Sequence, residues 1–385
     1  FHMSQTITLK GIAWDHPRGY QPLRATSKAF AEIYQGVSIK WNIRSLREFG
    51  DMPIESLIET YDLITIDHPY MGEADANKLL LPLENGLTKS EIGNLKRQSV
   101  GPSFESYHYK GHLYALPIDA AALFAASRND LMSALNLELP HMRSDLFDFY
   151  KKIPSGYKVA WPLCSTDLWC SFLSLCAQDG GRNFIEDFNV DETIGIEVLN
   201  ELKGHLNYLH SDSLNWNPIQ ILNHMATNDE IIYSPYLFGY TNYSREGFAK
   251  NNINFSNSPT NPKNNISTIL GGVGLAVSAK SKHADLALAY AGYVAKGETQ
   301  EGIYTENGGQ PGNLLAWQSA VNNVLCNNFF NNTLKTMEMA YVRPQHPGWN
   351  KFQEKGAAML HRGLVKNISS TSLVKGLNQL YRSIV

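Results

Sequence analysis

The sequence lacks three features that would direct its function: a cluster of basic residues, a long apolar run and a paired-cysteine motif. The chain has 385 residues and a formal net charge of -3. Nucleic acids and anionic membrane surfaces are bound through clustered Lys and Arg, so we expect neither as the main partner. No stretch approaches the about 20 apolar residues that a membrane span requires, so we expect no membrane-spanning segment.

Cysteine is also scarce. The chain has four cysteines, Cys164, Cys170, Cys176 and Cys326. None of them forms a C-x-x-C pair, and the spacing of six between the first three is more typical of a buried helical face than of a zinc site. We therefore predict core thiols and no resident metal or cofactor.

The sequence does not begin with an apolar leader segment. The location therefore stays open: the protein could be exported and its leader removed, or it could be cytoplasmic.

The chain does contain enough apolar material for a large core. Hydrophobic residues make up 43% of it and charged residues 18%, and its length suggests two or more domains. Strands and helices alternate in the first part. Strands are expected at 7–14, 37–43, 63–66 and 114–117, and helices at 18–35 and 53–60. This order predicts βαβ units, and hence a mostly parallel sheet.

A second α/β series follows a small-residue segment, 120–128, that could cross to another lobe. We expect strands at 159–162 and 230–235 and helices at 169–178 and 191–210. The aromatic stretch after residue 235 is too polar for a core, and the Asn- and Pro-rich stretch 251–267 indicates a surface loop. The glycines at 271–274 precede an apolar strand and a helix at 283–295. Residues 333–385 are expected to be mainly helical, with an interruption at 341–349.

One tripeptide occurs twice, as Asp15–Pro17 and Asp67–Pro69. Each copy directly follows a predicted strand of the first sheet. The carboxyl ends of strands form the ligand crevice of an open α/β sheet, so both copies are expected at one edge and at one site.

The repeated tripeptide is also compatible with capping, metal binding or catalysis. Asp followed by Pro is good helix-start chemistry, so the copies could serve only as caps. Asp15, His16, Asp67 and His68 also offer ligands that zinc or iron accepts, although adjacent side chains of an extended segment point to opposite sides. Finally, His16 or His68 could act as a general base with an Asp orienting it, in an enzyme built on a binding-protein fold.

Four segments, taken in order, resemble the extracellular solute-binding proteins of family 1, the substrate-binding components of ABC importers for sugars and related molecules. These segments are Tyr114–Asp119, Gly271–Val277, Gly308–Gly312 and Arg343–Trp349. The resemblance covers roughly residues 7 to 360 and depends on the order and spacing of weak motifs. The chain departs from the family at Ala125–Arg128, where Tyr-Asn is usual.

The resemblance implies a periplasmic-binding-protein-like α/β fold, with two lobes joined by a hinge and a ligand cleft between them. The first lobe would combine 4–117 with 270–318, and the second 118–269 with 319–385. It also implies a monomer that delivers its ligand to the membrane subunits of an ABC transporter, in the periplasm or outside the cell.

Ligand contacts follow from the same resemblance. In the first lobe and its crossings they would be Trp14, Asp15, His16, Arg18, Asp67, His68, Asp119, Gly271, Gly272 and Gln310. In the second lobe they would be Trp161, Ser165, Asp167, Trp169, Tyr236, Phe238, Tyr240 and Asn242. Aromatic rings that stack on sugar C–H faces, together with paired donors and acceptors for hydroxyls, fit a carbohydrate. Arg18 could hold a carboxylate, which would favour a sugar acid.

Overall fold

The computed structural model describes residues 6–385, which divide into two compact units. Unit 1 comprises the described residues up to Ala121, with Gly271–Phe330 and Arg343–Pro347. Unit 2 comprises Ala122–Leu270, Asn331–Val342 and Gly348–Val385. The division expected from the sequence assigned 319–330 and 343–347 to the second lobe, whereas both segments are part of unit 1.

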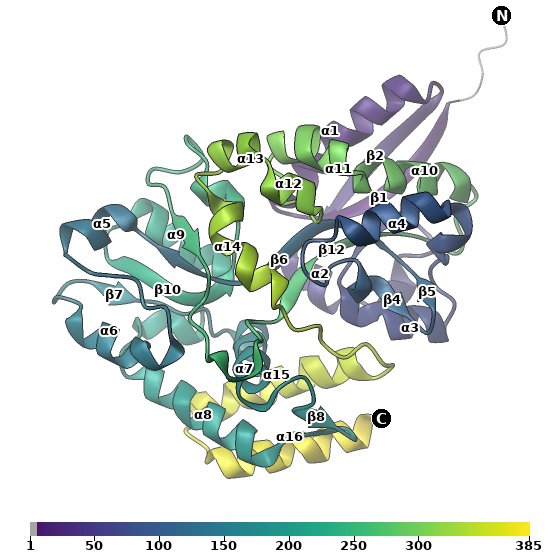
Figure 1. The fold of residues 1–385 in the computed structure, drawn as a ribbon. Coiled ribbons are helices and arrows are strands. Elements are labelled where there is room, and N and C mark those ends of the chain that lie inside the picture. The colour runs from purple at the N-terminus through teal and green to yellow at the C-terminus, as the bar shows by residue number, and fades with distance from the viewer. Residues whose placement is uncertain (1–5) are drawn as a thin grey trace, which may run out of the picture. The chain divides into compact units, whose positions relative to one another are not determined.

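The sheet of unit 1 has the strand order β2-β1-β3-β12, followed by the first half of β6. The strands are β1 (Ile7–Trp14), β2 (Val37–Arg44), β3 (Leu63–Ile66), β6 (Leu116–Ser127) and β12 (Leu270–Val277). β1 is parallel to β2 and β3, as predicted, whereas β12 is antiparallel to β3. In Figure 1 the green strand β12 accordingly lies with the purple strands from the start of the chain.

Helices complete unit 1, and several of them share a core with its sheet. They are α1 (Pro17–Ile33), α2 (Leu46–Asp51), α3 (Met71–Ala76), α4 (Lys89–Arg97), α10 (Ala284–Ala295), α11 (Gly297–Thr299), α12 (Leu314–Gln318) and α13 (Ala320–Leu325), with a small hairpin β4 (His108–Tyr109) and β5 (His112–Leu113). α1 has the amphipathic pattern of a surface helix. It buries Leu23 and Phe30 against the apolar side chains of β1, β2 and β3.

Unit 2 is built on the second half of β6. β10 (Ile231–Phe238) pairs antiparallel with β6 and parallel with β7 (Lys158–Val159), and β11 (Asn254–Ser256) pairs antiparallel with β6. The small-residue segment 120–128 is therefore mostly strand, and the chain passes from unit 1 to unit 2 inside it. All twelve residues of β6 are buried, which explains why its sequence shows no alternation of apolar and polar residues.

The helices of unit 2 are α5 (Asn129–Ala134), α6 (Leu146–Lys152), α7 (Ser165–Gly180), α8 (Glu192–Leu206), α9 (Pro218–Thr227), α14 (Phe329–Glu338), α15 (Trp349–Val365) and α16 (Ser370–Ile384), with a hairpin β8 (Ile185–Glu186) and β9 (Asn189–Val190). α14 begins in unit 1 and continues into unit 2. Figure 1 shows the yellow helices α15 and α16 beside α7 and α8, which they contact. No helix within residues 6–385 is long and apolar enough to cross a bilayer.

Three local expectations were wrong. Residues 53–60 form only a 3-10 turn at Ile54–Ser56, while the helix lies earlier, at α2. The aromatic stretch after residue 235 is buried except for the half-buried Phe238, and β10 extends into it as far as that residue. The expected surface loop 251–267 contains β11, and its Phe255 is buried.

Candidate functional site

The two Asp-His-Pro copies lie in register at one edge of the unit 1 sheet. In the parallel pairing of β1 with β3, Gly11 is opposite Leu63 and Ile12 is opposite Ile64. The same offset of 52 residues relates Asp15 to Asp67 and His16 to His68. The prediction that both copies follow neighbouring strands at a common edge is therefore confirmed.

Each copy also begins a helix, but through a different residue. In the first copy, Nδ1 of His16 accepts a hydrogen bond from the Arg18 backbone N–H at 3.0 Å, which caps α1. In the second copy, Oδ1 of Asp67 accepts from the His68 backbone N–H at 2.9 Å and caps the turn His68–Tyr70. The expectation that Asp is the cap is thus correct for Asp67 and wrong for the first copy, where His16 takes that role and Asp15 lies exposed at the surface.

The imidazole of His16 is held neutral by its surroundings. Burial, with a smaller contribution from the positive charge of Arg18, lowers the pKa of His16 to about 3. A neutral ring with Nδ1 as the acceptor carries its proton on Nε2. The residue therefore presents a hydrogen-bond donor at the strand end rather than a charge.

Asp67 forms an ion pair with an arginine that lies far away in the sequence. Nη2 of Arg343 donates to Oδ1 and Oδ2 of Asp67 at 3.0 and 2.8 Å. Burial alone would raise the pKa of Asp67, but the charge and hydrogen bonds of its neighbours, Arg343 first, lower it to about 2. The side chain of Asp67 nevertheless remains 15% exposed, so one side of the carboxylate faces outward.

His68 is fully buried beneath the same segment. Its Nε2 accepts a hydrogen bond from the Arg343 backbone N–H at 3.1 Å, and its carbonyl accepts from Nε2 of Gln345 at 2.9 Å. Burial is the largest cause that lowers the pKa of His68. The sequence analysis missed Arg343 and Gln345 as partners of this edge, although both lie in a segment that carried the family resemblance.

A second buried ion pair joins α1 to the crossing strand β6. Nε and Nη2 of Arg18 donate to Oδ2 and Oδ1 of Asp119 at 2.8 and 2.6 Å, and both side chains are almost completely buried. The fork of one guanidinium is thereby matched to both oxygens of one carboxylate, the strongest geometry for such a pair. Neither residue is poised to bind an ionised ligand.

Trp14 and Arg44 are the last residues of the neighbouring strands β1 and β2. Trp14 is only 2% exposed, and its ring lies 5.5 Å from that of Phe49 and against Gly19. Nη2 of Arg44 donates to the carbonyl of Thr65 at 2.7 Å. Both residues therefore support the edge from inside.

The remaining predicted residues of unit 1 lie where β12 meets β6. Gly272 has φ +104°, and a Cβ atom there would lie 2.4 Å from the Asp119 carbonyl oxygen, so only glycine fits. Gly271 is buried. Nε2 of Gln310 donates to the carbonyl of Ala120 at 2.9 Å, and the Gln310 carbonyl accepts from Ala120 N–H at 3.0 Å. Gln310 thus fastens β6, while Gly272 remains half-buried.

Most of the predicted aromatic residues of unit 2 belong to its core. The Trp161 ring is fully buried at 4.8 Å from Tyr236, whose hydroxyl donates to the Pro259 carbonyl at 2.6 Å. Trp169 packs 5.3 Å from Phe352. Tyr240 and Asn242 are also buried, whereas Phe238 is half-buried.

The start of α7 holds the other predicted residues of unit 2. Cys164 Sγ donates to Oδ2 of Asp167 at 2.9 Å, and Ser165 between them is half-buried. Burial raises the pKa of Asp167 to about 7 and also raises that of the Cys164 thiol. A thiol with a raised pKa is a poor nucleophile, so Cys164 does not resemble an activated cysteine.

The positions of the His, Cys, Asp and Glu side chains in the described part of the chain do not support a metal site or a reactive cysteine. Within residues 6–385, no group of three or more His, Cys, Asp or Glu side chains could hold a metal ion. His16 Nδ1 and His68 Nε2 each accept a hydrogen bond from a backbone N–H group, so neither nitrogen can bind a metal ion without losing that bond. Three of the four cysteines, Cys170, Cys176 and Cys326, are buried, as predicted for core thiols.

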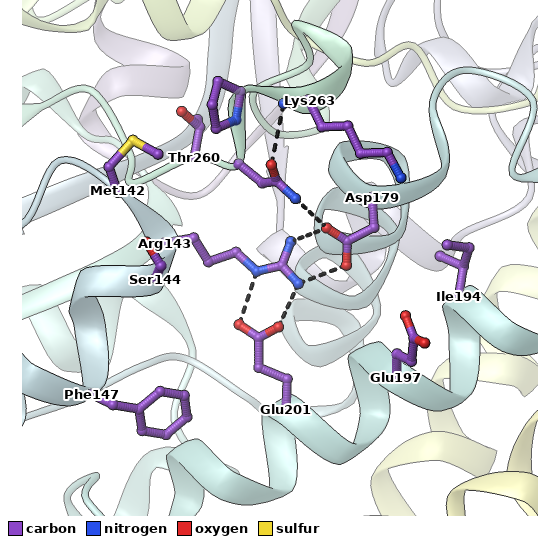
Figure 2. Close-up of a pocket in the computed structure, with 12 residues that line it drawn as sticks. Met142, Arg143, Ser144, Phe147, Asp179, Ile194, Glu197, Glu201, Thr260 and Lys263 are labelled. Atoms are coloured by element: carbon purple, nitrogen blue, oxygen red, sulfur yellow. Dashed lines mark hydrogen bonds and ion pairs between the residues drawn. The ribbon is translucent and has the colours of Figure 1, made fainter.

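A cavity of unit 2 contains none of the predicted residues. It has a volume of about 600 Å³ and lies between α8, the end of α7 and the 260–263 loop (Figure 2). Arg143 donates to Asp179 from Nη1 and Nη2 at 2.8 Å and to Glu201 from Nε at 2.9 Å, and Asp179 also accepts from Asn261 at 3.0 Å. These contacts pair Arg143 with two carboxylates, so its guanidinium links α7 to α8, whereas Glu197 and Lys263 of the same lining take part in none of them.

Comparison with known proteins places this geometry in a family. Residues 56–320 match the family described as bacterial extracellular solute-binding protein. That span is more than half of the chain. It confirms the predicted family, that of the bacterial solute-binding proteins.

Solved structures of similar fold cover almost the whole chain. Maltose-bound MalE3 of T. maritima has a TM-score of 0.84 at 15% identity, with 98% of this chain and 100% of that chain covered. A ribitol complex of an ABC transporter solute-binding protein from Agrobacterium radiobacter gives 0.83 at 16% identity, with 99% of both chains covered. An α-D-tagatose complex of such a protein from Thermotoga lettingae gives 0.81 at 17% identity, with 99% and 100% covered. The predicted two-lobed α/β fold is confirmed.

Proposed function

The chain belongs to the bacterial extracellular solute-binding proteins, and on that premise we propose that it captures a neutral polyhydroxylated molecule, a sugar or sugar alcohol, for an ABC importer. The similar structures hold maltose, ribitol and tagatose as ligands of those proteins. They support a carbohydrate here, with the membrane subunits of an importer as partner and the periplasm or cell surface as location.

The pairing of charges in unit 1 supports a neutral ligand over a sugar acid. Three guanidinium groups lie at or beside the strand ends, and each already donates within the protein. Arg18 binds Asp119, Arg343 binds Asp67, and Arg44 binds the carbonyl of Thr65. A ligand carboxylate would have to compete with these contacts for a charged donor. This observation carries the proposal, and it argues against Arg18 as the anchor of a carboxylate.

The ligand contacts that we propose are the predicted residues that are exposed, as Asp15 is, or partly exposed, as the others are. In unit 1 these are Asp15, His16, Asp67 and Gly272, and in unit 2 they are Ser165 and Phe238. Asp15 and Asp67 supply acceptors for hydroxyls, His16 supplies a donor, and Phe238 supplies a ring face. The predicted residues that are buried hold these groups in place.

Ligand-dependent stabilisation tests the function. We expect maltose, ribitol, mannitol or a related neutral sugar to raise the melting temperature, while gluconate and galacturonate do not. A ligand that binds only the folded protein stabilises it by about 2.7 kcal/mol at roughly 100 times its Kd. A response to the acids alone would refute a neutral ligand, and no response to either set would refute carbohydrate binding.

Asp15→Asn tests the strand-end contacts. Losing a charged acceptor for a ligand hydroxyl should weaken binding by about tenfold in calorimetric titration. Stability should change little because the side chain is exposed. Asp285→Asn, an exposed substitution at the start of α10, is the matched control and should leave affinity unchanged. Equal affinity of both variants would remove Asp15 from the site.

A further inference from the structure

The outer edge of β2 forms a basic groove that the binding of a sugar does not explain. The groove has a volume of about 530 Å³ and runs between α1 and the edge strand. It is lined by Arg24, Ser27, Lys28, Ala31, Ser38, Ile39, Lys40, Trp41 and Asn42. Three of these residues are basic and none is acidic, in a chain whose net charge is negative.

The three cations of the groove are available to a partner. Arg24, Lys28 and Lys40 are all exposed. None of the three takes part in an ion pair with an acidic side chain in the described part of the chain. Arg24 instead lies over the ring of Tyr20, at 4.6 Å from its centroid.

The backbone of β2 is open toward the groove. Gly36 and Arg44 accept hydrogen bonds through their carbonyls from Ile7 and Asp15, at 2.8 and 2.7 Å. The N–H and C=O groups of successive residues in a strand point to opposite edges of that strand. The main-chain groups of the even-numbered residues between Gly36 and Arg44 therefore also point toward β1. The N–H and C=O groups of Ile39 and Trp41 therefore point away from the sheet, and β2 is the last strand in its order.

Positive charge flanks this open edge on both faces of the sheet. Trp41 Nε1 donates to Ser27 Oγ on α1 at 2.7 Å, so the Trp41 side chain lies on the α1 face together with Arg24 and Lys28. Lys40 is the neighbour of Trp41 in the strand, so its side chain lies on the opposite face. A strand added beside β2 would meet a cation on each face.

We propose that this edge binds an extended acidic polypeptide segment by strand addition. The backbone of the segment would pair with Ile39 and Trp41, and carboxylates on adjacent residues would face Lys40 on one side and Arg24 and Lys28 on the other. Main-chain pairing supplies affinity in such complexes, and side chains supply specificity. A lysine on an edge strand also discourages pairing with apolar strands, so the same charges select an acidic partner.

The probe for this edge is a fluorescent octapeptide, Val-Glu-Glu-Val-Glu-Glu-Val-Glu, titrated with the full chain at low salt. Fluorescence anisotropy should show binding, and Lys28→Glu with Lys40→Glu should weaken it roughly tenfold or more, as reversal of two charge contacts does. Lys89→Glu, an exposed reversal on α4, is the matched control and should bind as the parent does. Sugar binding should be the same in all three proteins.

Two further measurements separate strand addition from attraction of charge alone. N-methylation of the four central peptide bonds removes the donors that would pair with β2, and Ile39→Pro removes an outward N–H at a position where an edge strand tolerates proline. Each should weaken binding roughly tenfold, by loss of main-chain pairing. If neither does, or if vesicles of anionic phosphatidylglycerol bind through the same lysines while the peptide does not bind, the proposal is overturned.

Discussion

Asp119→Ala is expected to lower the free energy of unfolding by about 3–5 kcal/mol, because it leaves the Arg18 guanidinium buried without its carboxylate. Nε and Nη2 of Arg18 donate to Asp119 at 2.8 and 2.6 Å, and the two side chains are 4% and 0% exposed. Water cannot replace the lost partner at such burial. Urea denaturation followed by tryptophan fluorescence would measure the change.

The double variant Arg18→Met with Asp119→Leu is the control for this pair. Replacing both members of a buried ion pair with apolar residues of similar size is often neutral, so the double variant should be more stable than Asp119→Ala alone. A loss below about 1 kcal/mol for Asp119→Ala would mean that the guanidinium finds other acceptors or water. That result would contradict the structural role given to the pair.

The same pair shows where inference from the sequence ends. Its members are separated by 101 residues, and those of the Asp67–Arg343 pair by 276. The strand-end rule correctly placed Asp67 at one edge with the first tripeptide copy, which Arg18 follows directly. No local sequence pattern indicates which distant charged residue will pair with Arg18 or with Asp67. For Arg18 the partner is Asp119, and this pairing changes its expected role from binding a ligand carboxylate to a structural one.

The periodicity of apolar residues predicted the helices and strands that have one buried face. It failed for segments that are buried on all sides. β2 alternates and was predicted almost to the residue, at 37–43 against Val37–Arg44. The stretch 236–243 was expected to be too polar for a core, but two of its tyrosine hydroxyls form hydrogen bonds inside the protein. Tyr236 donates to the Pro259 carbonyl at 2.6 Å, and Tyr243 donates to Oδ1 of Asn223 at 2.6 Å. A buried tyrosine with a partner behaves as an apolar residue, which composition alone does not reveal.

One missed element did carry a signal. α2 begins at a capping box in which Ser45 Oγ accepts from Glu48 N–H at 3.1 Å, and a Glu48 carboxylate oxygen accepts from Ser45 N–H at 2.8 Å. Serine followed three residues later by glutamate is the sequence signature of this cap. The helix was instead expected after Pro53, because proline at the first turn is also a start signal.

Acidification is expected to destabilise the protein from about pH 6.5 downward, because His16 and His68 are held neutral in the fold. The unfolded chain binds a proton on each histidine near pH 6.5, whereas the folded pKa of His16 is about 3 and that of His68 is lowered by burial. The unfolded state therefore holds more protons as the pH falls. The free energy of unfolding declines by about 1.4 kcal/mol per pH unit through His16, and His68 acts in the same direction. This loss continues for His16 until the pH reaches about 3.

Single variants isolate each histidine, which is necessary because Asp167 acts in the opposite sense. The pKa of Asp167 is raised to about 7, so its proton uptake on acidification favours the folded state between about pH 7 and 4. His16→Asn keeps a good cap for α1 and removes the titrating ring, and His68→Gln retains an acceptor for Arg343 N–H. Between pH 5 and 6, His16→Asn should flatten the slope of unfolding free energy against pH by about 1.4 kcal/mol per unit, and His68→Gln should flatten it in the same direction. An unchanged slope in either variant would show that its ring takes up a proton in the fold, and for His16 it would mean that the cap of α1 does not depend on a neutral imidazole.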